Sequence, residues 1–231
     1  LEGLPLALEL AASWARMITP SQMAEQIRSD LHSLTSRRKD VEDRHTSLHA
    51  ALNRTWKDLS PELQDACALL AYLPGSWTID TARAILENSN AHQIVADLVE
   101  RAIVRSVPGT EPTEFEMLAL FRTFANEQAS LEICEKRVLR HGRYWVDRLK
   151  SLEELSYGRA IAAAGKDIVH YRLAADTVLR HFSLDQAIRY DSLAPYFRES
   201  GAAVEGSCIL GQLAERAQNE PIDPARLGGF L

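Results

Sequence analysis

The chain has 231 residues, and its 26 Lys and Arg stand against 32 Asp and Glu, giving a formal net charge of −6. A balance this acidic argues against an extensive surface for nucleic acid or anionic lipid, because both need clustered cations. The longest apolar runs fall short of the roughly 18 residues that span a bilayer, and no signal peptide is visible. A soluble protein is therefore expected.

The cysteines point to the same kind of protein. The three of them lie far apart, each within an apolar helical pattern: Cys67, Cys134 and Cys208. An odd number without the spacing of a disulfide framework or a CxxC pair indicates reduced thiols. We therefore expect a cytoplasmic protein, and we expect neither a metal site nor a catalytic residue in this chain.

The first forty residues predict two helices. Four apolar positions recur at three- and four-residue steps: Leu6, Leu10, Trp14 and Met17. A helix is expected over about 4–18, with Pro5 in its first turn. A second helix is expected from its N-cap Ser21 to about Leu34. The polar stretch 35–45 then predicts a linker.

The next ninety residues predict helices and one hairpin. Helices are expected at about 46–59, from Pro61, at about 79–87 and at about 91–102, with a turn at 73–77. Two β-rich segments, 102–107 and 113–118, flank a Pro/Gly turn and predict a hairpin. The helix after it carries a stripe of Leu120, Phe121, Phe124 and Gln128. This order is the layout of a winged-helix domain.

Residues 135–218 predict helices only. They are expected over 136–155, 168–182, 185–201 and 202–218, with Gly201 in a turn. Helices paired in this way indicate TPR-like hairpins. Five aromatic residues are expected to pack in their core rather than to line a ligand groove: Tyr144, Trp145, Tyr190, Tyr196 and Phe197. Cys134 is expected to pack inside and His141 to lie on the surface.

The fold class expected is therefore mainly α, in four parts. Residues 1–40 would form a helical part, which the family resemblance described next assigns to the end of a helical nucleotide-binding subdomain, and 41–134 would form a winged-helix domain with a small β-hairpin. Residues 135–218 would form TPR-like helical hairpins, and 219–231 an extended tail.

Several stretches resemble, in order and spacing, the landmarks of one family over about residues 1–130. LEGLPLALELAA (1–12) resembles the GLPL motif of signal-transduction ATPases with numerous domains, the bacterial NB-ARC or AP-ATPase type of nucleotide switch. RHTSLHAAL (44–52) with Leu59-Ser60-Pro61 resembles the opening of that family's winged helix. LAYLPGSWTIDTARAIL, LVERAIVRSV and FEMLALFRTFANEQ resemble the segments that follow.

The resemblance implies a function for the whole protein. In this family the GLPL segment follows a P-loop ATPase core, and its proline packs against the bound nucleotide. Gly3, Leu4 and Pro5 would therefore contact ADP or ATP, bound with magnesium, only together with an upstream core. The chain itself would hold no cofactor and would not be an enzyme. It would couple the nucleotide state of a slow ATPase switch, through hinges near 35–44 and 130–136, to a sensor and a fused effector such as a transcriptional regulator.

The implied partners are the upstream core, a protein or small-molecule signal at the helical repeats, and further copies of the parent, with no membrane. Direct DNA binding is not expected, because AHQIVADLVER (91–101) and the wing PGTEPTE (108–114) offer few cations. GRAIAAAGKD (158–167) departs from P-loop spacing and lacks its hydroxyl. The alternatives are a nucleotide-independent helical scaffold and a winged-helix DNA-binding regulator.

Overall fold

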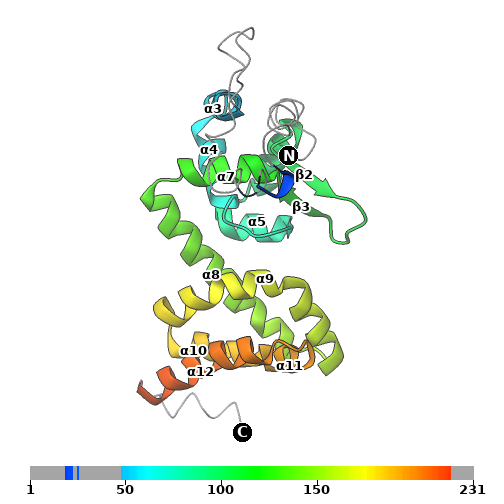
Figure 1. The fold of residues 1–231 in the computed structure, drawn as a ribbon, viewed down its shortest axis with the longest axis vertical. Helices are drawn as coiled ribbons and strands as arrows, with labels where there is room; N and C mark the ends of the chain where they lie inside the picture. Colours follow the sequence, from blue (N-terminus) through cyan, green and yellow to red (C-terminus); the bar gives the residue numbers. More distant parts are fainter. Residues whose placement is uncertain (1–18, 23–24, 26–47, 220–231) are drawn as a thin grey trace. The chain divides into compact units, whose positions relative to one another are not determined.

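The computed structural model describes residues 19–22, 25 and 48–219 (Figure 1). The chain divides into two compact units, Leu1–Glu135 (unit 1) and Lys136–Leu231 (unit 2). Each unit has its own hydrophobic core, and each is mainly helical apart from a small sheet in unit 1. The predicted helix over 4–18 and the predicted linker lie outside the described residues.

Residues 19–22 begin a helix whose N-cap lies two residues before the predicted one. The Gln22 amide nitrogen donates to the Thr19 hydroxyl at 3.3 Å, and the Gln22 side-chain oxygen accepts from the Thr19 amide at 3.0 Å. Thr19 rather than Ser21 is therefore the N-cap, in a reciprocal capping box. Pro20 takes the first helical position, where a missing N–H costs nothing.

Unit 1 places a three-stranded sheet among helices. Its elements in chain order are α3 (Leu48–Lys57), α4 (Pro61–Leu70), β1 (Trp77–Thr78), α5 (Ile79–Leu86), α6 (Ala91–Glu100), β2 (Val104–Val107), β3 (Glu114–Met117) and α7 (Ala119–Gln128). Ser60 and Thr78 cap α4 and α5 by accepting backbone N–H groups. The predicted helices and hairpin are confirmed here within a few residues.

The sheet is antiparallel in the order β1-β3-β2. Trp77 pairs with Phe115, and their rings stack with centroids 5.7 Å apart. Trp77 therefore belongs to a strand, although the sequence pattern predicted a turn through residue 77. Two residues are too short to show strand alternation, so the partner strand, not the local sequence, determines this pairing.

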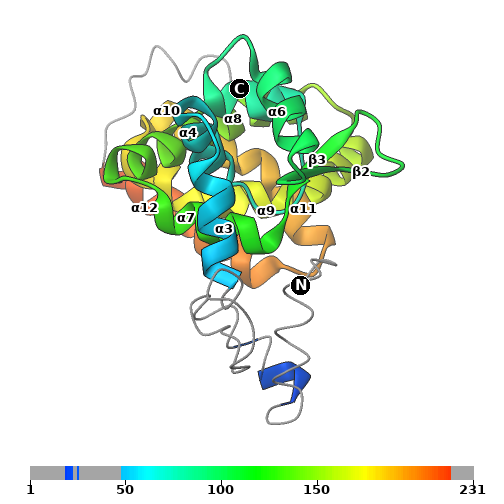
Figure 2. The same cartoon turned by 90° about the horizontal axis from the view of Figure 1, so that it is seen from above.

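The core of unit 1 forms between the helices and the inner side of the sheet. Both α3 and α4 pack against α7 (Figure 2). The indole of Trp56 contacts the rings of Phe121 and Phe124 at centroid distances of 6.3 and 5.9 Å. Leu120 is buried with these phenylalanines as predicted, whereas Gln128 is exposed and Ala125 takes the inner position.

Unit 2 is a group of antiparallel and crossing helices. Its elements are α8 (Leu131–Glu153), which begins in unit 1, then α9 (Tyr157–His181), α10 (Leu184–Ala187), the 3₁₀ helix η3 (Ile188–Leu193), α11 (Ala194–Glu199) and α12 (Ala203–Asn219). The long helix and the last helix are confirmed, and Gly201 has the positive φ of 75° expected in the turn.

Two other predicted helices of unit 2 differ from the structure. Helix α9 begins eleven residues before the predicted residue 168. The stretch 185–201 is three short segments rather than one helix. Pro195 explains the interruption, because its ring lacks an N–H and clashes with the carbonyl of Asp191 in a continuous α-helix.

Three glycines let aromatic rings approach helix backbones in unit 2. A Cβ on Gly142 would lie 3.1 Å from the Phe182 ring, and one on Gly165 would lie 3.1 Å from the Tyr196 ring. The closest approach is at Gly206 of α12, where a Cβ would lie 2.6 Å from the Cβ of Phe197 on α11. Helices α11 and α12 can therefore pack together here only because residue 206 has no side chain.

Substituting Gly206 with Ala should lower the free energy of unfolding by about 1–3 kcal/mol, since the added methyl forces α11 and α12 apart. The matched control is Gly211→Ala on the same helix. A Cβ there meets nothing within 4 Å, so alanine should stabilise by up to about 1 kcal/mol through helix propensity. Urea unfolding followed by circular dichroism measures both, and equal stabilisation by the two variants would contradict the close approach.

Candidate functional site

The predicted nucleotide-contacting residues Gly3, Leu4 and Pro5 lie outside the described residues, so they stay a prediction. The P-loop-like stretch 158–167 lies inside the helix α9. Its Asp167 carboxylate pairs with the Arg148 guanidinium at 3.2 Å. Because helical N–H groups are used within the helix, this stretch cannot wrap a phosphate.

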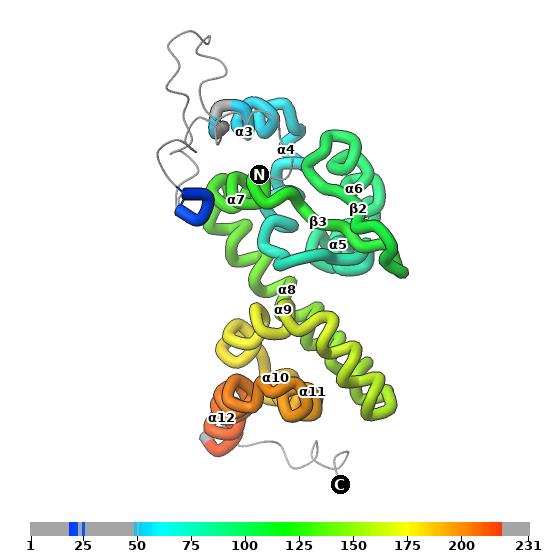
Figure 3. The backbone as a smooth tube through the Cα atoms, turned by 45° about the vertical axis from the view of Figure 1, so that its right-hand side comes forward, coloured from blue at the N-terminus to red at the C-terminus, as the bar shows by residue number. Residues whose placement is uncertain are grey.

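The helix before the hairpin, α6, is divided into an apolar and a solvent-facing side. Its inner side buries Ala91, Ile94, Val95 and Leu98. Helix α6 packs against α5 and lies beside β2 (Figure 3). The helical period therefore sends one continuous set of side chains to solvent, which we call the α6 surface: His92, Gln93, Ala96, Val99 and Glu100.

The α6 surface is poor in groups that could read a base edge. The Gln93 amide nitrogen donates to the Asp97 carboxylate at 2.8 Å, so this amide is already engaged. Ala96 and Val99 contribute apolar area, and Val99 is 37% exposed. The commonest contacts to base edges come from arginine, lysine, asparagine and glutamine, whereas this helix side offers a small apolar stripe beside carboxylates.

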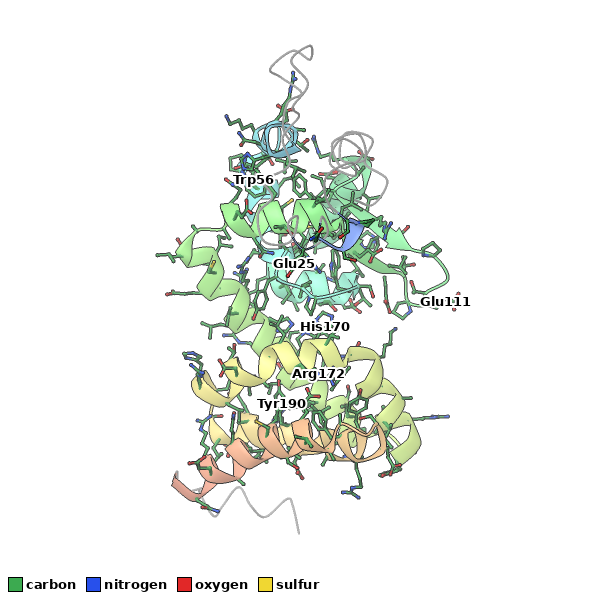
Figure 4. All side chains as sticks on the ribbon, in the orientation of Figure 1. Glu25, Trp56, Glu111, His170, Arg172 and Tyr190 are labelled. Atoms are coloured by element: carbon green, nitrogen blue, oxygen red, sulfur yellow. The ribbon has the colours of Figure 1, made fainter. Side chains whose placement is uncertain are left out.

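The hairpin loop beside α6 also lacks cations. Thr110 orders the loop, because its hydroxyl donates to the Val107 carbonyl at 3.0 Å and accepts from the Glu114 amide at 2.9 Å. Glu111 lies at the outer end of the hairpin (Figure 4). The stretch 106–121 contains no Lys or Arg. The last cation before it, Arg105, pairs with Glu116 at 2.6 Å.

The charge of unit 1 agrees with this local pattern. Over residues 48–135 there are 13 Asp and Glu against six Lys and Arg. Such a surface repels phosphate backbones rather than neutralising them. The α6 surface and the hairpin loop therefore present exposed apolar groups beside carboxylates, which can contact apolar and basic groups of another molecule.

Unit 2 contains a buried polar cluster between α8 and α9. His141 is fully buried and His170 is 3% exposed. The two rings meet with Nε2 of His141 3.3 Å from Nδ1 of His170. The indole of Trp145 stacks on His170 with centroids 4.4 Å apart and planes 16° from parallel. Desolvation, and to a smaller extent the charge of His170, lower the pKa of His141 to about 3.

The sequence prediction for His141 was wrong. It placed the imidazole on the surface, yet His141, Trp145, Leu149 and Leu152 follow each other on one side of α8 and are all buried. The sequence already shows this helical spacing, and the surface position was predicted only because histidine is polar. Cys134 is half-buried, with its thiol 4.0 Å from the Ala129 carbonyl.

The five aromatic residues predicted to pack do so. Trp145, Tyr190 and Phe197 are at most 3% exposed, and Tyr144 and Tyr196 are partly buried against the same core. The fully buried Tyr190 donates its hydroxyl to the Tyr171 carbonyl at 3.0 Å. Tyr190 of η3 and Arg172 of α9 lie on the side of α9 that faces the following helices (Figure 4). Burial raises the pKa of the Tyr190 phenol, so it stays a donor.

Replacing Tyr190 with Phe should cost about 1–2 kcal/mol of unfolding free energy, because a buried hydrogen bond is lost without change of shape. Tyr157→Phe is the control. Its hydroxyl also donates across helices, to Glu199 at 3.0 Å, but Tyr157 is 55% exposed and water replaces the lost partner. Thermal unfolding should therefore distinguish them, and two equally stable variants would show that the Tyr190 hydrogen bond does not stabilise unit 2.

Among residues 19–22, 25 and 48–219, no group of three or more His, Cys, Asp or Glu could hold a metal ion. No helix in the part of the chain that the structure describes is long and apolar enough to cross a membrane. Cys67 is buried, and burial raises its thiol pKa to about 12, so it is not an activated nucleophile.

The comparisons with known proteins add no relative. No family model matches the sequence, and neither a curated protein nor a solved structure gives a match.

Proposed function

We propose that this chain is a regulatory part of a nucleotide-dependent signalling switch ATPase, in which unit 1 is a winged-helix domain that contacts protein rather than DNA. Unit 2 is then the first TPR-like helical hairpins of the sensor. The nucleotide would lie against Gly3, Leu4 and Pro5, together with an ATPase core carried by the same protein, as the motif resemblance implies.

The observation that carries this proposal is the chain order of unit 1. A helix is followed by a short strand, two helices and a hairpin. The short strand and the two strands of the hairpin form one sheet in the order β1-β3-β2. The pairing of β1 with β3 ties the segment after α4 to the hairpin. A small sheet backing a pair of helices supports the winged-helix interpretation, and the RHTSLHAAL and LSP motifs come directly before it.

The charge and packing of unit 1 favour the protein-contact role over the DNA-binding alternative. The helix that would enter a major groove carries Asp97 and Glu100. The wing carries Glu111 and Glu114, and Glu114 is nearly buried, accepting from the Ser76 hydroxyl at 2.5 Å. In a switch, such a surface is covered in one nucleotide state and released in the other, so each nucleotide must favour one arrangement.

The direct test is ADP affinity, measured by titration calorimetry on the protein extended upstream through its ATPase core, with the present 231 residues as the blank. We expect binding by the extended protein alone. Pro5→Ala should weaken binding by on the order of 1 kcal/mol, or about fivefold in Kd, because an apolar contact with the nucleotide is lost.

The matched control is Pro20→Ala. Pro20 occupies a helix start, as Pro5 is predicted to do, but it is exposed and lies outside the GLPL motif, so this variant should bind ADP as the wild type does. Equal weakening by both variants would trace the effect to helix starts rather than to a nucleotide contact. An extended protein that ignores ADP would contradict the switch and favour the nucleotide-independent scaffold. Salt-sensitive retention on DNA would instead favour the DNA-binding alternative.

A further inference from the structure

The contact between the two buried imidazoles restricts their protonation. A hydrogen bond between Nε2 of His141 and Nδ1 of His170, 3.3 Å apart, requires one nitrogen to donate and the other to accept. Two neutral rings satisfy this requirement. Two protonated rings do not, because both facing nitrogens would then carry a hydrogen and both rings a positive charge.

The surroundings of this pair are apolar and closely packed. Trp145 contacts both rings, with its centroid 6.0 Å from that of His141 and 4.4 Å from that of His170. The indole is 3% exposed, and its Nε1 has no hydrogen-bond partner among the described residues. Next to His141, the backbone of Gly142 lies against the Phe182 ring. An added charge would therefore lie in a low-dielectric core.

The charged neighbours do not favour an imidazolium. Arg137 precedes His141 by one helical turn on α8, and Lys166 precedes His170 by one turn on α9. The carboxylate nearest in sequence, Asp167, pairs with Arg148. The other titratable groups around the cluster on α8, α9 and η3 are the phenols of Tyr144, Tyr171 and Tyr190. Burial raises the pKa of Tyr171 and of Tyr190, so these two phenols stay neutral.

We propose that the His141–His170 pair is an acid-sensitive lock between α8 and α9, which holds unit 2 closed near neutral pH and opens it on mild acidification. A proton taken up from water by His141 places a positive charge between the two helices, in the low-dielectric core around Trp145. Opening lets water solvate the imidazolium, so unit 2 loses its packing around Trp145.

The direction of the pH effect follows from proton binding. A histidine in the unfolded chain has a pKa near 6.5, and burial holds the pKa of His141 at about 3 in the folded chain. Above pH 6.5 neither state binds the proton, so the contribution to stability is complete. Between pH 6.5 and about 3 only the open state binds it, so stability falls as the pH falls.

The experiment compares urea unfolding of the 231-residue chain at pH 7, 6 and 5 with that of two variants, His141→Gln and His141→Phe. Between pH 7 and 5 the unfolding constant of the wild type should rise about 25-fold more than that of either variant, since both lack the titrating group. His181→Gln, an exposed histidine at the end of the same α9, is the control and should keep the wild-type pH dependence.

Variants whose unfolding constants follow the wild type between pH 7 and 5 would overturn the proposal. The imidazole NMR signals of the wild type decide the matter should the variants not fold. We expect the His141 ring to stay neutral to pH 5 in the folded chain while exchange-broadened signals of α8 and α9 report opening. Titration of His141 near pH 6.5 in a chain that stays folded would also overturn it.

Discussion

Burial of the apolar side of α6 is the constraint on which the surface of unit 1 depends. Ile94, Val95 and Leu98 must face the core, because they supply its contacts with α5 and the sheet. Their positions in the helical period leave His92, Ala96 and Val99 toward solvent. The same packing that stabilises the fold therefore presents a surface without a cation at its centre, next to a hairpin loop without one.

Unit 2 depends on close packing of a different kind. Its helices meet where a glycine on one faces a ring on another, as Gly206 faces Phe197. Side-chain hydrogen bonds also join α9 to α12: the Arg172 guanidinium donates to both carboxylate oxygens of Glu205, at 2.5 and 2.7 Å. Imidazoles buried in a core this closely packed lose their hydrogen bonds to water, and the contact between His141 and His170 offsets part of that loss.

The sequence predicted the elements that follow local rules. Two β-rich segments on either side of a Pro/Gly turn located the hairpin, and the pair Ser60-Pro61 located the start of α4. It did not locate β1, whose two residues form a strand only because β3 lies beside them. The sequence analysis did not predict the break in the helix before α11, although Pro195 in the first turn of α11 indicates one. The extension of α9 was missed because Gly158 and Gly165 are poor helix formers, and Gly165 is needed for the ring of Tyr196.

Of the candidate sites, one could be predicted from the sequence and the other could not. The charge of α6 and of the hairpin loop can be counted in the sequence, because the residues that form this surface are neighbours along the chain. The His141–His170 pair joins residues 29 positions apart, and only the packing of α8 on α9 brings them together. A polar residue in an apolar stripe is the signal that could have indicated His141, and its partner could not have been named from the sequence.

The central claim is that unit 1 responds to the nucleotide bound elsewhere in the same protein. Hydrogen exchange of the full-length protein, compared between ADP and a non-hydrolysable ATP analogue, tests it most directly. The account predicts slower exchange with ADP in the peptides that cover α6 and the β2–β3 hairpin, because this surface is then covered. Identical exchange of these peptides in the two nucleotide states would contradict it.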